Sequence, residues 1–195
     1  TEGLIASGAI LYYLSETQHN KIQHITNIQR IAEDAYVWMD KFTIRNLELY
    51  HSYNPNAVTL LDVIDKTLSP MGARLLKRWL ALPLKDISKI RSRHEVISYL
   101  KTNPEVLQQI QYQIKQISDL ERLISKVPLG KVNPRELVQL KKALMAVAPL
   151  RAMLTSTGHD ELAKIADGFN PCPGLVERIA KQIVDEPPVN LSKGG

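Results

Sequence analysis

Residues 59–80, TLLDVIDKTLSPMGARLLKRWL, decide the fold class because they contain two helix starts in succession. Thr59 is placed to cap a short helix that runs through Asp65. Ser69 and Pro70 begin a second helix, since a serine oxygen accepts from a free backbone N–H and proline loses no hydrogen bond at the first helical position. The second helix offers a core the side chains of Met71, Leu75, Leu76, Trp79 and Leu80.

The same kind of helix start recurs further along the chain, after Pro83 has ended this helix. Asn103-Pro104 and Asn133-Pro134 each place a capping asparagine before a proline. A single helix from Pro104 to Val127 would be about 36 Å long at about 1.5 Å per residue, which suits a strut. Asp86 is expected to cap a helix with one inward stripe, in which His94 is a hydrogen-bonded core residue: Ile87, Ile90, His94, Ile97 and Leu100.

The remaining segments complete the predicted fold. Residues 3–18 predict a helix buried on more than one side, and the aromatic and β-branched run at 35–39 favours a short strand before a turn at Asp40. Pro149 is expected to kink or interrupt its helix, and a last helix is expected over 174–184. The sequence therefore predicts a mostly α fold, an elongated multi-helix bundle with one or two short strands near residues 27–50.

Composition limits the function classes. The chain has 195 residues and 44% hydrophobic content, enough for one compact domain or one elongated helical piece. Its longest apolar stretch, at 143–150, is far shorter than the roughly 20 residues of a membrane span. The single cysteine, Cys172, cannot form an internal disulfide, which fits a reducing compartment and makes the cytoplasm the expected location.

Motifs for catalysis and metal binding are missing from the sequence. No G-x-x-x-x-G-K-[ST] phosphate loop and no G-x-S-x-G serine turn occurs, and the five histidines form no H-x-x-x-H pair. Asp62 and Asp65 lie three residues apart, a spacing more typical of capping or solvated residues than of an acid pair. We therefore expect no catalytic site, no metal and no cofactor in this chain, and a small helical enzyme is disfavoured.

Basic residues leave a nucleic-acid partner open. The net charge is +5, and basic side chains cluster at 77–78, at 85–93 and at 141–151. Such clusters can follow a phosphate backbone, but they also occur on solvated helix faces whose aliphatic stems cover the core. The solvated face is the preferred interpretation, and an autonomous nucleic-acid-binding helical domain remains the alternative function.

Residues 40–49, DKFTIRNLEL, together with residues 59–80, resemble the core domain of the MutS family of DNA mismatch-repair proteins. The order continues with 83–86 (PLKD), 119–122 (DLER) and 185–188 (DEPP), before Gly194-Gly195. The resemblance covers essentially the whole chain and is closer to the mismatch-recognising members than to the second branch of the family.

This resemblance implies that residues 1–195 are a single piece of the core or lever domain, ending where the DNA clamp begins. Such a piece links the ATPase to the clamp in the full-length protein and is not itself an enzyme. The resemblance further implies partners and cofactors outside this chain: the other domains, a second subunit, mismatched duplex DNA, ATP and Mg²⁺. Neither Phe42 nor Phe169 begins the phenylalanine-x-glutamate motif that reads mismatches.

The matching segments also contain the candidate site residues. Asp40, Arg45, Asn46 and Glu48 are expected to form a polar junction, to meet a neighbouring domain or to make a self-contained capping network. Gly72 is expected to permit a close approach of helices near Ser69 and Pro70, and Leu76 and Trp79 to serve as core anchors. No DNA-binding residue is assigned. The candidate residues are Asp40, Arg45, Asn46, Glu48, Ser69, Pro70, Gly72, Arg74, Leu76 and Trp79.

Overall fold

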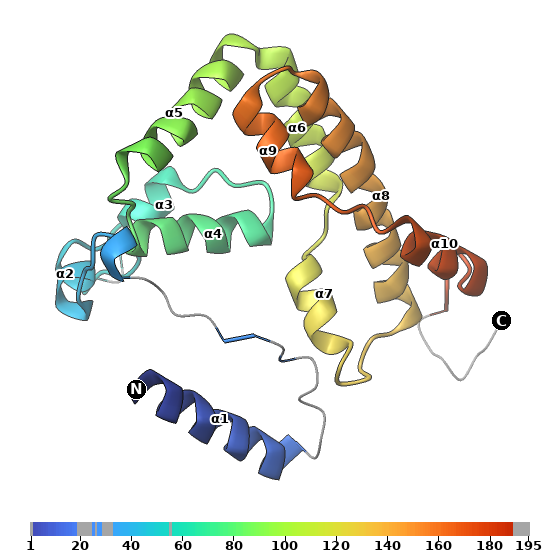
Figure 1. Cartoon of the computed structure of the whole chain (residues 1–195), viewed down its shortest axis with the longest axis horizontal. Coiled ribbons are helices and arrows are strands. Elements are labelled where there is room, and N and C mark those ends of the chain that lie inside the picture. The colour runs from blue at the N-terminus through green and yellow to red at the C-terminus, as the bar shows by residue number, and fades with distance from the viewer. Residues whose placement is uncertain (1, 19–24, 26, 29–32, 55, 189–195) are drawn as a thin grey trace.

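The computed structural model describes residues 2–18, 25, 27–28, 33–54 and 56–188, and this part of the chain is predominantly helical (Figure 1). The prediction of a mostly α fold is confirmed. None of the described helices is both long and apolar enough to cross a membrane. In chain order the helices are α1 (Glu2–Gln18), the 3-10 helix η1 (Glu33–Ala35), α2 (Lys41–Asn46), α3 (Leu60–Ile64), α4 (Pro70–Ala81), α5 (Ile87–Thr102), α6 (Pro104–Gln116), α7 (Leu120–Lys126), α8 (Pro134–Ser156), α9 (Asp160–Asp167) and α10 (Pro173–Gln182).

Side-chain caps explain where several helices begin. The hydroxyl of Thr59 accepts from the Asp62 backbone N–H at 3.3 Å, and the Asp62 carboxylate accepts from the Thr59 N–H at 2.9 Å, a reciprocal capping box. Ser69 Oγ accepts from the Gly72 N–H at 3.1 Å, with Pro70 in the first turn of α4. The sequence predicted both of these starts as well as those of α5 and α8. The four predicted capping residues are Thr59, Ser69, Asp86 and Asn133.

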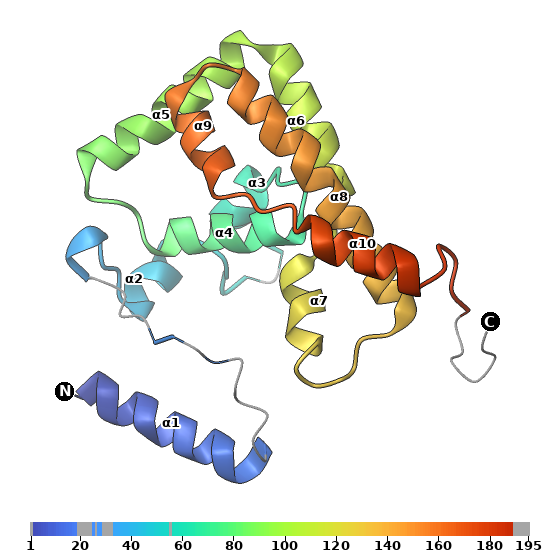
Figure 2. The same cartoon turned by 45° about the vertical axis from the view of Figure 1, so that its right-hand side comes forward.

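The central helix of the fold is α8, which packs against α6, α7, α9 and α10. Figures 1 and 2 both show α6 beside α8, with α9 lying against them. Two buried apolar clusters hold this arrangement. The first joins α6, α8 and α9 and consists of Ile110, Leu150, Leu154, Leu162 and Ala166. The second joins α7, α8 and α10 and consists of Leu123, Leu140, Leu144 and Ile179.

Helix α1 stands apart from the other helices in both views (Figures 1 and 2). Its apolar side chains are exposed, including Leu4 at 73% and Tyr12 at 69%. The prediction that this helix is buried on more than one side is therefore wrong within the described chain. The run of apolar residues in α1 is typical of a covered helix, but no described element covers it.

The segment near residues 27–50 differs from the prediction of short strands. Among its described residues there is one isolated antiparallel bridge, between Tyr36 and Leu84, and no longer strand. Two backbone bonds flank the bridge, from Val37 N–H to the Pro83 carbonyl at 2.7 Å and from Lys85 N–H to the Ala35 carbonyl at 3.2 Å. Residues 29–32 of the predicted strand region lie outside the described residues. Where only a turn was predicted, residues 41–46 form α2.

The predicted inward stripe of α5 is wrong at three of its five residues, whereas Ile90 and Leu100 are partly buried. Ile87 and Ile97 are 64% and 61% exposed, and His94 is exposed instead of lying in the core. The side chains that pack on the first apolar cluster are Val96, Tyr99 and Leu100. The helix carries two apolar stripes, and its packing against α6 and α9 selects the one that the periodicity did not favour.

The predicted strut from Pro104 to Val127 is interrupted. Helix α6 ends at Gln116, and Asp119 caps a separate helix, α7. Helix α8, in contrast, runs through Pro149 without the predicted interruption. Pro149 and Met145, whose carbonyl loses its helical donor, lie on the exposed face of α8, where water can replace that bond. Helix α9 was not predicted.

Candidate functional site

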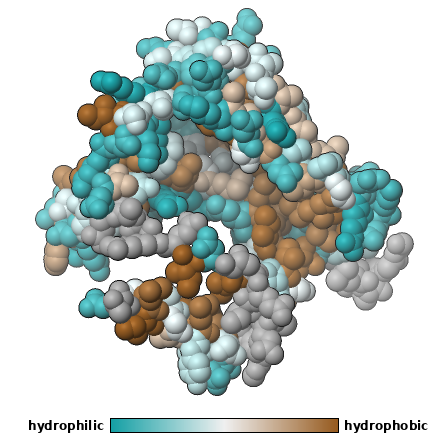
Figure 3. Space-filling view, viewed as in Figure 1, coloured by the Kyte–Doolittle hydropathy of each residue, from teal (hydrophilic) through white to brown (hydrophobic). Residues whose placement is uncertain are grey.

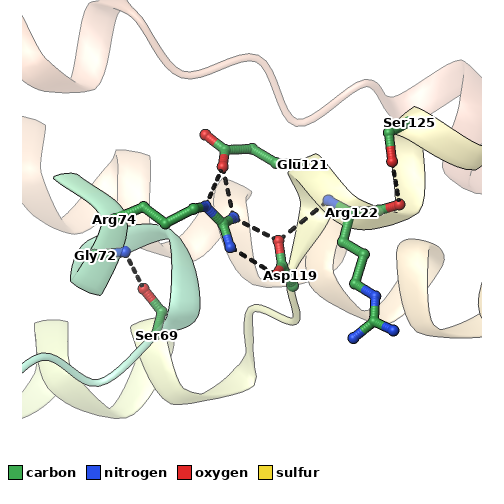
Figure 4. Close-up of polar contacts among 7 residues, drawn as sticks. All are labelled: Ser69, Gly72, Arg74, Asp119, Glu121, Arg122 and Ser125. Atoms are coloured by element: carbon green, nitrogen blue, oxygen red, sulfur yellow. Dashed lines mark hydrogen bonds and ion pairs between the residues drawn. The ribbon is translucent and has the colours of Figure 1, made fainter. Parts of the chain in front are cut away.

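Arg74 connects two of the matching segments that are far apart in the sequence. It projects from α4, whose first turn is set by the Ser69 cap and by Pro70. Its guanidinium meets the start of α7, where Asp119 is the N-cap and Glu121 lies in the first turn (Figure 4). The three side chains form an ion-pair junction between α4 and α7.

The geometry of the junction is that of a fork. Arg74 Nη1 donates to Asp119 Oδ2 at 2.9 Å, and Nη2 donates to Asp119 Oδ1 at 2.7 Å. Arg74 Nε donates to Glu121 Oε2 at 2.7 Å. A planar guanidinium that engages one carboxylate with two parallel bonds fixes the orientation as well as the distance. Lysine at this position would keep the charge but lose the fork.

Asp119 has two tasks. Its Oδ1 accepts from Arg74 and also from the Arg122 backbone N–H at 3.2 Å, so the carboxylate caps α7 while it binds α4. The hydrogen bonds from Arg74 hold the pKa of Asp119 below its ordinary value, and the pKa of Arg74 is raised by Asp119 and then by Glu121. Asp119 therefore stays ionised, and Arg74 stays charged, throughout the neutral range.

The junction lies at the surface. The Arg74 side chain is 48% exposed, Asp119 is 21% exposed and Glu121 is 66% exposed. Exposed ion pairs add little to the stability of a fold because water screens them. The fork is better suited to setting the angle between two helices than to stabilising them.

The candidate residues at 40–48 make contacts within their own corner of the chain. Asp40 Oδ1 caps α2 by accepting from the Thr43 N–H at 2.6 Å, which lowers the pKa of Asp40. Arg45 stacks over the ring of Tyr53, with Cζ 3.9 Å from the ring centroid. For Asn46, at the end of α2, the described chain shows no side-chain bond.

Glu48 takes the left-handed conformation, with φ of 48°, directly after α2. Its carboxylate accepts from Ser52 Oγ at 2.6 Å, and its carbonyl accepts from the Leu60 N–H at 3.2 Å. These bonds, together with the buried side chain of Leu49, close the loop between α2 and α3. Asp40, Arg45 and Glu48 thus make local capping, stacking and loop contacts. Within the described residues, no hydrogen bond or ion pair joins them to Arg74.

The apolar candidates of α4 are less buried than expected. Leu76 is half-buried, and Trp79 is 42% exposed, so the prediction of Trp79 as a core anchor is wrong within the described chain. The Arg93 guanidinium instead stacks on the Trp79 ring at 3.6 Å. At Gly72 a side chain would meet Ser69 Oγ at 3.2 Å and Thr67 Cβ at 3.4 Å. The close approach at Gly72 is therefore to the preceding turn and not to another helix.

A second polar connection was missed from the sequence. Lys141 of α8, 7% exposed, donates to Asp185 Oδ1 at 2.5 Å, and Arg135 Nε donates to the Pro187 carbonyl at 2.9 Å. The segment after α10 is thereby tied to α8. The DEPP motif signalled that residues 185–188 matter, but nothing in the sequence pointed to their partners 44 and 52 residues away.

Both polar connections join side chains that lie more than 40 residues apart in the sequence. Within the described residues, no group of three His, Cys, Asp or Glu side chains could hold a metal ion. The carboxylates of both polar connections are already occupied by cations. Of the sequence candidates for a chemical step, His94 is exposed. The carboxylates of Asp62 and Asp65 accept hydrogen bonds from the hydroxyls of Thr59 and Thr67.

Known proteins resemble this chain closely. A family model described as MutS domain III matches residues 42–195. The DNA mismatch repair protein MutS of Flavobacterium johnsoniae is 67% identical over 193 residues, which are 99% of this chain and 22% of that relative. The proteins of the same name from Christiangramia forsetii and Parabacteroides distasonis are 58% and 51% identical, over 100% and 99% of this chain and 22% of each relative.

The chain thus spans about a fifth of the length of the curated relatives it matches. The family model covers the ion-pair junction, the segment after α10 that is tied to α8, and α2 with its following loop from Phe42 onward. On this match and these identities, the chain belongs to the MutS domain III family.

Proposed function

We propose that this chain is the lever segment of a DNA mismatch-repair protein, a noncatalytic link between the ATPase and the DNA clamp. Residues 1–195 then form a single piece of the core domain that ends where the clamp begins. In the full-length protein we expect contacts with the other domains of the chain, a second subunit, mismatched duplex DNA, and ATP with Mg²⁺ bound elsewhere. The cytoplasm is the expected location.

The observation that carries this proposal is the pair of polar connections at the two sides of α8. The 23 residues of α8 form a strut about 35 Å long at about 1.5 Å per residue. Arg74 binds the start of α7, which packs on α8, and Lys141 binds the segment that leaves α10. Because close-packed helices move as rigid bodies between few arrangements, a displacement at one connection would reach the other.

The test is Arg74→Ala in the full-length protein. Allosteric coupling is a difference between binding free energies, typically about 5-fold to 150-fold in affinity. We expect DNA affinity without nucleotide, and ATP affinity without DNA, to stay within about twofold of the parent, while the change in DNA affinity on adding ATP shrinks by about fivefold or more. Fluorescence anisotropy of a mismatched duplex, with and without ATP, measures the two DNA affinities, and calorimetric titration of the DNA-free protein measures the ATP affinity.

The control is Lys181→Ala, which removes a more exposed ion pair within a single helix, that with Glu177 in α10. Its coupling should equal that of the parent. Normal coupling in Arg74→Ala would refute a role for this connection. ATP hydrolysis by the isolated 195-residue chain, or selective binding of mismatched over matched duplex by that chain, would refute the lever itself.

A further inference from the structure

A pocket of about 600 Å³ opens between α2 and the second half of α4. Its lining includes Lys41 and Arg45 from α2, Lys77 from α4, and Tyr50 with His51 from the loop after α2. This volume is within the range of small-molecule sites. The sequence analysis grouped Lys77 with Arg78 alone, and the fold brings it to two cations more than 30 positions away.

The pocket is positively charged and contains no acid. Three cationic side chains line it, and no Asp or Glu does. Within the described residues, Lys41, Arg45 and Lys77 take part in no salt bridge, unlike Arg74 or Lys141. The nearby carboxylate of Glu48 accepts from Ser52 Oγ at 2.6 Å and is not part of the lining. The three charges remain available to an anion.

Aromatic rings position two of these cations. The Arg45 guanidinium stacks on Tyr53, and Lys77 Nζ lies 4.9 Å from the centroid of the Tyr50 ring. Such cation–π contacts restrict long side chains that would otherwise move freely in water. Burial raises the pKa of Tyr50, so its hydroxyl stays neutral and can donate. Ile44 adds an apolar wall beside the charges.

We propose that this pocket binds a nucleotide phosphate, either of a free nucleotide or of a nucleic-acid strand, with Lys41, Arg45 and Lys77 facing the phosphate oxygens. A phosphate monoester carries nearly two negative charges and three strong acceptors, and a strand supplies one charge at each nucleotide. A single carboxylate has only two oxygens and would leave at least one of the three cations without a partner. Tyr50 and Ile44 offer a flat, apolar surface on which a base or sugar can rest.

The proposal is tested on the 195-residue chain with four probes: a labelled 12-nucleotide single strand, unlabelled dAMP, inorganic phosphate, and an acidic octapeptide of glutamates. Anisotropy of the labelled strand is measured between 50 and 200 mM salt. Three phosphate contacts on a single strand give a slope of log K against log salt of about −2, which is about a twentyfold loss of affinity over this range. In the triple variant Lys41→Gln, Arg45→Gln, Lys77→Gln, the slope should approach zero.

The matched control removes three exposed cations outside the pocket, with Lys101→Gln, Lys115→Gln and Arg151→Gln. It should retain the slope of the parent. A second variant, Lys41→Arg with Lys77→Arg, keeps the charges and should bind like the parent, and circular dichroism verifies that each variant is folded. Displacement of the strand by millimolar dAMP identifies a free-nucleotide site, whereas displacement by neither dAMP nor phosphate identifies a strand site.

Three results would overturn the proposal. The control triple variant could lose as much affinity as the pocket variant, which would indicate general attraction to a basic surface. The chain could bind no phosphate probe at 50 mM salt. The acidic peptide could displace the strand more strongly than dAMP and phosphate do, with the same dependence on Lys41, Arg45 and Lys77, which would assign the pocket to an acidic protein surface.

Discussion

Lys141 is a charged residue in the interior of the described chain, with a partner that is itself mostly in water. The Lys141 side chain is 9% exposed, whereas the Asp185 side chain is 81% exposed. A buried ammonium without a counter-ion is costly. Loss of the ion pair would therefore cost more free energy at the buried Lys141 than at the exposed Asp185. This asymmetry explains how α8 can hold the segment after α10 at Asp185 while Asp185 itself stays exposed.

The pair makes a prediction about pH. The hydrogen bond from Lys141 lowers the pKa of Asp185, so the connection is complete above the unfolded pKa of about 3.9 and is lost as the pH falls through the lower folded value. We expect an NMR titration of the Asp185 carboxylate to give a midpoint below 3.9 in the parent and close to 3.9 in Lys141→Met. An apolar side chain of similar length should keep α8 packed, so the melting temperature of Lys141→Met should be unchanged or higher.

The control for this titration is Lys181→Met, which removes the cation of a different ion pair, that with Glu177 inside α10. The Asp185 midpoint should not move in this variant. An Asp185 midpoint that is ordinary in the parent, or that stays low in Lys141→Met, would show that Lys141 does not hold this carboxylate in solution.

Residue pairs such as these mark the limit of prediction from sequence. Arg74 and Asp119 were both recognised, each within its own matching segment, but 45 residues separate them and no local rule pairs them. The Asp119 cap could have been identified from the acidic residue two positions later, in the first turn. The cation that shares this carboxylate follows from packing, which only the folded chain specifies.

At the scale of helices, two segments with the same sequence signature behave differently. Asn133 Oδ1 accepts from the Glu136 N–H at 2.9 Å, and Glu136 reciprocates, so Asn133 caps the start of α8. Asn103 makes no such bond to α6, and its Nδ2 donates backwards to the Tyr99 carbonyl at 2.8 Å, at the end of α5. One asparagine acts as an acceptor and the other as a donor.

Replacing each asparagine with aspartate separates the two roles. A carboxylate caps a helix start as well as an amide does, so Asn133→Asp should change the free energy of unfolding by less than about 0.5 kcal/mol. Asn103→Asp loses the donor to the Tyr99 carbonyl and should cost about 1 kcal/mol, the net value of a typical hydrogen bond. Urea unfolding followed by circular dichroism measures both. Equal costs at the two positions would contradict this assignment.

The helix starts that were predicted correctly are those decided within four residues, at Thr59, Ser69, Asp86 and Asn133. The errors arose where neighbours decide. Helix α5 has two apolar stripes, and the first apolar cluster takes the stripe of Val96 and Tyr99. The break between α6 and α7 lies at Ile117, where the backbone is extended. Asp119 then caps a new helix, α7, and binds Arg74 of α4.

The whole molecule has a larger surface than its mass requires. A compact monomer of 22.0 kDa exposes about 9,300 Å² by the usual scaling, whereas this chain exposes 14511 Å². Figure 3 shows apolar surface over α1 and around α7 and α8. The exposed apolar side chains in these regions include Leu4, Ile5, Tyr12, Tyr13, Ile124, Val127 and Met145. Such a surface suits a piece that other parts of a protein cover.

This surface predicts that the isolated chain self-associates, since large exposed apolar patches favour contact between copies. Light scattering after size exclusion should show a mass that rises above 22.0 kDa with concentration. Leu4→Glu with Tyr12→Glu places two charges on α1, at side chains 73% and 69% exposed, and should shift the chain toward monomer without changing its helix content.

Self-association through α1 must be distinguished from a general effect of added negative charge. Gln111→Glu with Gln116→Glu makes a similar change at exposed polar positions of α6 and should associate much as the parent does. If both double variants become monomeric, the net charge of +5 and not the apolar face of α1 controls association. A parent that stays monomeric at high concentration would mean that its apolar surface is too divided among α1, α7 and α8 to join two copies, because a stable interface needs about 800 Å² from each partner.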